Sequence, residues 1–157
     1  MRFSAAVRTC LRHKYFTFSG RASRSEYWFF MLFTILISIA IVIPITLTDG
    51  QKWFSGGNFN DLFSGVSGIF SVAFILFWLA VILPTFAVTV RRFHDVSLSG
   101  WWYGAYFVVD FIPYVGEYIA SIAGIAVFVV TVLKGTTGEN KYGPDPLGEK
   151  NMAEVFA

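Results

Sequence analysis

The sequence predicts an all-α integral membrane protein, built as a four-helix transmembrane bundle. Of its 157 residues, 55% are hydrophobic and only 14% are charged, whereas charged residues make up about 25% of a soluble domain. The apolar residues gather in runs that are long enough to cross a bilayer, and the basic residues lie outside these runs, mostly before the first and after the last. A water-soluble fold of this composition would expose large apolar patches, so we exclude that class of protein.

Four apolar helices account for these runs. Residues 27–47 and 66–90 carry no charge, and each run exceeds the roughly 20 residues that a spanning helix needs. The next apolar region, residues 101–133, is too long for one span and has proline and glycine near its middle. We therefore expect a hairpin of two short helices, residues 98–115 and 118–133. One long tilted helix is the alternative, and the proline and glycine argue against it.

The basic residues predict the orientation. In the four-span arrangement every Lys and Arg except Lys52 lies on one side of the membrane. The positive-inside rule makes that side cytoplasmic, so both termini are expected in the cytoplasm. A three-span arrangement places the lysines of the tail outside and fits less well. Residues 1–147 then form a single membrane domain, and residues 148–157 form a flexible cytoplasmic tail.

The first fourteen residues have the pattern of an amphipathic helix. Apolar side chains from Phe3 to Leu11 share one face, and Arg2, Arg8 and Arg12 share the other. Such a helix rests at the interface, in the headgroup region of the cytoplasmic leaflet. Packing against the protein's own cytoplasmic loops is an equal alternative. With Cys10 as the single cysteine and only two histidines, we expect no disulfide, no metal site and no cofactor.

Three polar stretches are denser than topology requires: "FSGRASRSEYW" (18–28), "RRFHDVSLSGWW" (91–102) and "KGTTGENKYGPDP" (134–146). All three fall on the predicted cytoplasmic side, so they are expected to meet in space. Forked guanidinium groups suit phosphate or carboxylate. The candidate residues for binding a ligand or anion are Arg21, Arg24, Arg91, Arg92 and His94. The expected structural polar cluster is Glu26, Asp95, Asn140 and Asp145.

These polar residues admit several interpretations. A salt-bridge network that fastens the three stretches together is the leading one, and a pocket for an anionic ligand is the second. An enzyme would need His94 and Asp95 to face a common cavity, with Ser97 or Ser99 as nucleophile. Trp28, Trp101 and Trp102 are expected to anchor the spans at the headgroup level.

The three polar motifs, in this order and at this spacing, resemble the DUF805 or YhaH-like family of small bacterial inner-membrane proteins. The resemblance runs from about Tyr15 to Pro146. It implies a multi-span protein of the bacterial inner membrane, and it brings no established activity.

We therefore predict a non-enzymatic membrane module that recognises an anionic lipid headgroup or a partner protein through its cytoplasmic face. Nucleic acid is not expected among its partners. One alternative is a small transporter or channel, formed as a homo-oligomer, that uses Asp110 inside the third apolar region. Less favoured is a membrane-embedded enzyme that acts on a lipid phosphate.

Overall fold

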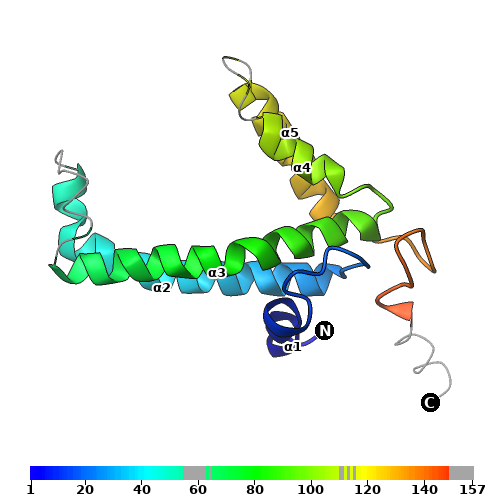
Figure 1. The fold of residues 1–157 in the computed structure, drawn as a ribbon, viewed down its shortest axis with the longest axis horizontal. Helices are drawn as coiled ribbons and strands as arrows, with labels where there is room; N and C mark the ends of the chain where they lie inside the picture. Colours follow the sequence, from blue (N-terminus) through cyan, green and yellow to red (C-terminus); the bar gives the residue numbers. More distant parts are fainter. Residues whose placement is uncertain (55–62, 64, 110–111, 113, 115, 149–157) are drawn as a thin grey trace. The chain divides into compact units, whose positions relative to one another are not determined.

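A computed structural model describes residues 1–54, 63, 65–109, 112, 114 and 116–148. Its elements are α1 (Phe3–Arg8), the π-helical turn η1 (Thr9–His13), α2 (Arg24–Phe54), α3 (Gly65–Asp95), α4 (Trp101–Val109) and α5 (Gly116–Val132), as Figure 1 shows. Among the described residues there is no β-strand, only an isolated bridge between Asn140 and Gly143. The predicted all-α class is confirmed.

The chain divides into two compact units, which we describe separately. The span unit is Met31–Leu83, and the motif unit is Met1–Phe30 together with Pro84–Ala157. Both α2 and α3 run from one unit into the other. All three polar stretches belong to the motif unit.

The span unit has small or polar residues inside and large apolar residues outside. Thr34, Ser67 and Ser71 are buried. In contrast, large apolar side chains along both helices are exposed, including Ile39, Ile43, Leu76 and Leu79. Phe33 and Phe77 are in edge contact, with ring centroids 6.4 Å apart. Membrane helices associate through small residues and present hydrocarbon to lipid, which is the distribution found in this unit.

Two helical segments are long and apolar enough to cross a membrane, Arg24–Leu47 and Gly65–Asp95. Only 11% and 22% of their most apolar stretches are buried within the protein. A core helix of a soluble protein would be mostly buried, so the low burial supports the membrane interpretation. These segments correspond to the first two predicted spans.

The third span is shorter than the sequence predicts, whereas the fourth agrees with the prediction to within two residues at each end. α4 has nine residues, and at about 1.5 Å per residue it covers less than half of a bilayer core. α5 has 17 residues, at the lower limit for a span. The four-span bundle therefore stays a prediction. Asp110 and residues 149–157, most of the predicted flexible tail, lie outside the described residues.

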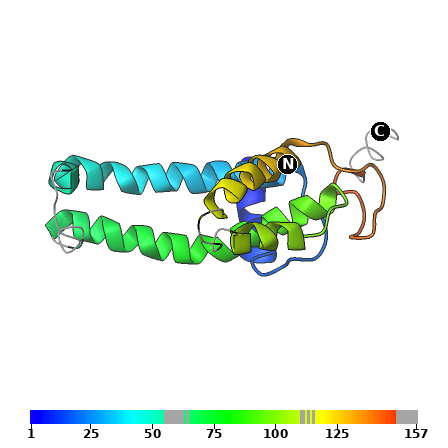
Figure 2. The ribbon, with the colours of Figure 1, turned by 90° about the horizontal axis from the view of Figure 1, so that it is seen from above.

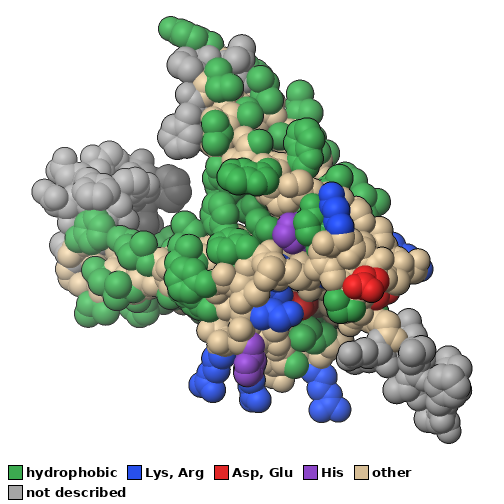
Figure 3. Space-filling view, turned by 45° about the vertical axis from the view of Figure 1, so that its right-hand side comes forward, with side chains coloured by type: hydrophobic (Ala, Val, Ile, Leu, Met, Phe, Trp, Pro, Cys, Tyr) green, Lys and Arg blue, Asp and Glu red, His purple; other side chains and the backbone are tan. Residues whose placement is uncertain are grey.

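Within the motif unit, α4 and α5 lie side by side (Figure 2). A small core forms where Phe93, Tyr103 and Val130 meet, with Phe86 and Val127 packed against it. On the face drawn in Figure 3, hydrophobic side chains cover α4 and α5, and a row of Lys and Arg side chains stands out from one edge of the molecule.

The N-terminal helix packs against its own unit. Ala6 and Cys10 are completely buried, and the Phe3 ring meets Phe29 edge-on at 6.1 Å. Part of the apolar face that an interfacial helix would place among headgroups is thus covered by protein, whereas Phe3 stays 40% exposed. Arg8 and Arg12 remain exposed on the opposite face.

Local signals in the sequence explain how the polar stretches are bounded. Ser23 precedes α2 and accepts a hydrogen bond at its Oγ from the backbone N–H of Glu26, at 3.3 Å, which caps the helix. α3 ends in a Schellman motif, since Leu98 N–H donates to the Phe93 carbonyl and Ser97 N–H to the His94 carbonyl. The motif requires a left-handed residue, and Ser97 adopts φ 63°.

Candidate functional site

The three polar stretches meet in the motif unit. Ala22 N–H donates to the Arg91 carbonyl at 3.1 Å, which joins the first stretch to the second. Thr136 N–H donates to the Asp95 carbonyl at 2.9 Å, which joins the second stretch to the third. The prediction that these distant segments lie together is confirmed.

Asp95 is the centre of the assembly. Its Oδ1 accepts from Arg21 Nε at 2.9 Å, and its Oδ2 accepts from Arg92 Nη1. All three side chains are buried, with Arg92 at 0% exposure and Asp95 at 4%. A buried carboxylate that is shared by two guanidinium groups avoids the cost of an isolated buried charge.

The remaining donors of these two arginines bind backbone carbonyls. Arg92 Nε donates to the Thr131 carbonyl at 3.2 Å, and Arg92 Nη2 donates to the Leu133 carbonyl. Both acceptors lie at the end of α5, where the last carbonyls of a helix lack partners within the helix. Arg21 donates to the carbonyls of Thr136 and Gly138. Arginine can make these contacts simultaneously because its planar fork carries five N–H groups.

Gly135 permits this packing. A Cβ built at that position would overlap the Asp95 carboxylate. Glycine is therefore required because the backbone after α5 passes directly against Asp95. This accounts for the glycine in the "KG" pair that opens the third polar stretch.

A second buried pair lies beside the first. Arg91 Nη1 donates to Glu26 Oε1 at 2.5 Å, and Cys10 Sγ lies 4.0 Å from the same oxygen. Arg91 Nε and Nη2 are buried without a hydrogen-bond partner among the described residues. Burial, followed by the charge of Glu26, raises the pKa of the Cys10 thiol to about 11. The thiol is thus neutral and unreactive near pH 7.

The five buried charges of these two pairs do not cancel. Three guanidinium groups, Arg21, Arg91 and Arg92, face two carboxylates, Glu26 and Asp95, which leaves one positive charge in excess. We refer to these five side chains as the buried network.

The two remaining members of the predicted polar cluster shape the backbone. Asn140 Nδ2 donates to the His94 carbonyl at 3.0 Å and to Thr136 Oγ1 at 2.9 Å. Asp145 accepts from the backbone N–H groups of Gly138 at 3.3 Å and Leu147 at 2.9 Å. Short side chains of this type commonly stabilise turns in this way.

A polar cavity of about 300 Å³ opens beside the buried network. It lies at the start of α2 and is lined by Ser23, Arg24, Ser25, Asp95, Lys134, Gly135, Thr137, Asp145, Pro146 and Leu147. Arg24 makes one long hydrogen bond, 3.5 Å to the Val132 carbonyl, so most of its donors stay available. Among the candidate anion ligands, Arg24 thus lines the cavity, whereas Arg21, Arg91 and Arg92 lie in the buried network.

His94 and Asp95 face different cavities. Asp95 borders the polar cavity, whereas His94 borders a recess beside Val90 and Gly100. The two side chains therefore do not form the acid–base pair that the enzyme interpretation requires. Among the described residues, no group of three His, Cys, Asp or Glu side chains could hold a metal ion.

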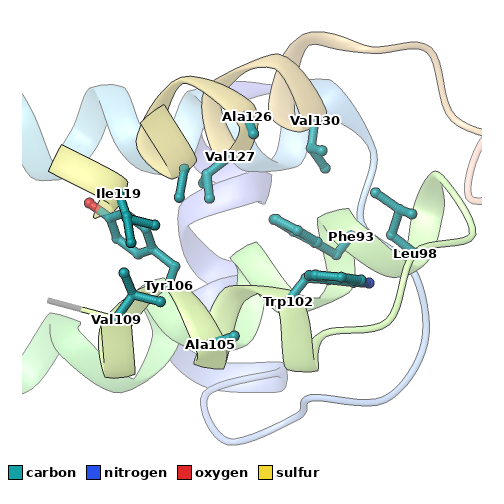
Figure 4. A pocket seen from close by; sticks show the side chains of 11 residues that line it. Phe93, Leu98, Trp102, Ala105, Tyr106, Val109, Ile119, Ala126, Val127 and Val130 are labelled. Carbon is teal, nitrogen blue, oxygen red and sulfur yellow. The ribbon is translucent and has the colours of Figure 1, made fainter. Parts of the chain in front are cut away.

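An apolar groove of about 360 Å³ lies between α4 and α5 (Figure 4). Phe93 and Trp102 line it from the α3 and α4 side, and Val127 and Val130 line it from α5. No charged residue is present among the described side chains of its lining.

The predicted tryptophan anchors differ in their contacts. Trp28 donates from Nε1 to the Thr131 carbonyl at 3.3 Å. Trp101 and Trp102 are 85% and 66% exposed in the protein alone, as side chains that reach into a membrane interface would be.

Sequence reasoning missed the parts played by Cys10, Lys134 and Gly135. Lys134 and Gly135 lie in the third polar stretch, so their place was indicated and their role was not. Cys10 gave only the signal of a position on the apolar face of the first helix.

Comparisons with known proteins place the chain in a family. The family model "Protein of unknown function (DUF805)" matches residues 15–144. This range includes the first two polar stretches and all but the last two residues of the third. Inner membrane protein YhaH of Escherichia coli K12 is 32% identical over 132 residues, which cover 84% of this chain and 88% of YhaH. Inner membrane protein YhaI of the same strain is 33% identical over 133 residues, 84% of this chain and 87% of YhaI. No solved structure matches the chain.

Proposed function

Because the chain belongs to the DUF805 family, whose relatives YhaH and YhaI are inner membrane proteins, we propose that it is a non-enzymatic, multi-pass inner-membrane module that binds the phosphate headgroup of an anionic lipid. The headgroup binds in the polar cavity, on the cytoplasmic face. One observation carries the proposal: Arg24 and Lys134 line a cavity at the start of a long helix, beside a buried network with excess positive charge.

The chemistry of the cavity suits a phosphate. Arg24 and Lys134 supply cationic donors, and the hydroxyls of Ser23, Ser25 and Thr137 supply neutral ones. The start of α2 adds the partial positive charge of a helix N-terminus. Asp95 also borders the cavity, but Arg21 and Arg92 offset its charge. Asp145 is engaged with two backbone N–H groups.

A lipid is favoured over a soluble anion by the surroundings. The apolar groove and the exposed apolar side chains of α5 belong to the same unit, and they offer contact for hydrocarbon. Basic residues next to membrane spans attract anionic lipids of the cytoplasmic leaflet.

Two variants of equal charge change test the site. We expect Arg24→Gln/Lys134→Gln to lower the affinity for phosphatidylglycerol about tenfold, which corresponds to about 1.4 kcal/mol. The control, Arg8→Gln/Arg12→Gln, removes two exposed charges from the N-terminal helix and should leave the affinity unchanged. Native mass spectrometry of the full chain, extracted with its lipids, measures retention of phosphatidylglycerol against phosphatidylcholine.

Equal losses in both double variants would show general surface attraction and overturn the proposal. Displacement of the lipid by millimolar inorganic phosphate would point to a soluble anion instead. Arg91 and Arg92 are poor test positions because both are completely buried and paired.

The proposed orientation has its own test. Any even number of spans places both termini on one side of the membrane, and the basic polar stretches favour the cytoplasm. In a Cys10→Ala background, Arg2→Cys and Glu139→Cys should react with an impermeant maleimide in inverted vesicles only. Labelling of either position in right-side-out vesicles would contradict this orientation.

A further inference from the structure

The free nitrogen of His94 points to a second binding site, separate from the polar cavity. His94 Nδ1 lies 3.2 Å from the Gly20 carbonyl. A carbonyl oxygen only accepts hydrogen bonds, so Nδ1 carries the proton. In the neutral ring, Nε2 is then a lone-pair acceptor, and the one hydrogen bond that the imidazole makes to a described residue is that of Nδ1.

The third polar stretch holds the imidazole ring in place. Tyr142 stacks on it, with ring centroids 3.8 Å apart and an interplanar angle of 6°. Lys141 Nζ lies 4.9 Å from the centroid of the Tyr142 ring. Asn140 donates to the backbone carbonyl of His94 itself. The direction of Nε2 is therefore set by contacts made before any ligand arrives.

Gly100 keeps the space at Nε2 clear. A Cβ built on Gly100 would lie 2.5 Å from Val90 Cγ1 and 3.3 Å from His94 Nε2. Any side chain there would push the start of α4 away from α3 and crowd the imidazole edge. The "SGWW" motif thus needs glycine where α4 approaches His94.

His94 borders a recess of about 610 Å³, which we name the His94 recess. Its walls include three aromatic rings, those of Phe18, Trp101 and Tyr142. Its polar side chains are His94 and Ser99 alongside the Tyr142 hydroxyl, and the described lining contains no Lys, Arg, Asp or Glu. A mostly apolar pocket with a few oriented polar groups is the usual form of a small-molecule site.

These features define the chemistry of the occupant. No cationic side chain lines the recess, and the nearby Lys141 ammonium contacts the Tyr142 ring, so we do not expect the recess to select an anion. The aromatic walls favour a flat ring, and the lone-pair acceptor at Nε2 favours a ligand that donates a hydroxyl proton. We propose that the His94 recess binds the ring of a quinol, a neutral aromatic amphiphile, with one quinol O–H donating to His94 Nε2.

The two redox forms of one ligand provide the test. A decyl-substituted benzoquinol has O–H donors, whereas the corresponding benzoquinone has only acceptors. We expect the full chain in detergent to bind the quinol about tenfold more tightly than the quinone, measured by anaerobic titration calorimetry. His94→Phe keeps the stacking on Tyr142 and removes the acceptor, so it should abolish this preference.

Three further variants complete the design. His13→Phe changes the other, exposed histidine and should keep the preference, and Arg24→Gln/Lys134→Gln should also keep it. Trp101→Ala alters a side chain that is 85% exposed, so the fold is retained, and affinity for both forms should fall several-fold. Equal affinity of the wild type for quinol and quinone, an unchanged preference in His94→Phe, or unchanged binding in Trp101→Ala would each overturn the proposal.

Discussion

The span unit and the motif unit bury different kinds of polar side chain, and both differ in this respect from an ordinary soluble protein. In the span unit, hydroxyl-bearing and small side chains are inside, and the apolar side chains of Leu76 and Leu79 are 60% and 62% exposed. In the motif unit, whole charged side chains are inside, and Arg91 and Arg92 are completely buried. The span unit has little apolar interior, whereas the motif unit has an interior held together by charge.

This difference shows where specificity resides in the chain. Contacts among apolar side chains and lipid are interchangeable, because hydrocarbon outside the protein resembles hydrocarbon inside it. Buried ion pairs tolerate few arrangements, because each lost partner leaves a desolvated charge. We therefore expect substitutions in the buried network to cost much more than substitutions on the surface of the span unit.

The largest effect is expected for Asp95→Asn. The amide keeps the shape of the side chain but leaves Arg21 and Arg92 without a counter-charge, so the free energy of unfolding should fall by roughly 3–5 kcal/mol. Denaturant titration of the purified chain in detergent measures this loss. Asp145→Asn is the matched control, since that carboxylate only caps turns, and it should cost roughly 1 kcal/mol. Equal losses would mean that Asp95 contributes no more than a turn.

A smaller effect is expected for Gly135→Ala. The added methyl group overlaps the Asp95 carboxylate, and overpacking of this kind costs roughly 1–3 kcal/mol. Gly124→Ala is the control, because its Cβ would meet only Tyr106 atoms at 3.8 Å, an ordinary contact. In a helix that substitution should be neutral or slightly stabilising. A neutral Gly135→Ala would show that the segment after α5 can move away from Asp95.

The sequence predicted the class of fold, the first two spans and the meeting of the polar stretches, because these follow from composition and hydropathy. It did not predict that Arg91 pairs with Glu26 while Arg92 pairs with Asp95. Adjacent arginines look equivalent in a sequence, and their partners depend on which side of α3 each side chain leaves. Helical geometry separates neighbouring residues by about 100° around the axis.

The end of α4 was not predicted from the sequence, whereas α5 lies within two residues of the predicted fourth span. Proline and glycine near the middle of residues 101–133 predicted the hairpin, but the apolar residues before that turn led us to extend its first helix to residue 115. The structure ends α4 at Val109 and begins α5 at Gly116. His94 and Asp95 read as a pair in the sequence, yet neighbouring side chains on a helix diverge, and they border different cavities.

Cys10 offers a pH-dependent test of the buried network. Its thiol has a pKa of about 11 in the folded chain, above the ordinary value of 9.0. Between these values the unfolded chain loses a proton that the folded chain keeps, so rising pH favours unfolding by up to about 1.4 kcal/mol per pH unit. Below pH 9 the thiol is protonated in both the folded and the unfolded chain, so its titration takes nothing from the free energy of unfolding there.

The comparison with Cys10→Ala isolates this contribution from other groups that titrate in the same range. The stability difference between wild type and variant should be constant up to pH 9 and then shift against the wild type as pH rises toward 11. A difference that stays constant throughout would mean that the thiol is not held neutral beside Glu26.

The smallest effect is expected on the outer surface of the span unit. Leu79→Ala removes more hydrocarbon than Val81→Ala, but Leu79 is 62% exposed and Val81 only 2%. In lipid bicelles we expect Leu79→Ala to change the free energy of unfolding by less than about 0.5 kcal/mol, and Val81→Ala to cost roughly 1–2 kcal/mol. The smaller truncation should thus cost more, because only the buried side chain loses protein contacts. The opposite order would show that another protein molecule, such as a second copy of the chain, covers Leu79 in the membrane. The contrast between the two regions would then hold only for the isolated chain.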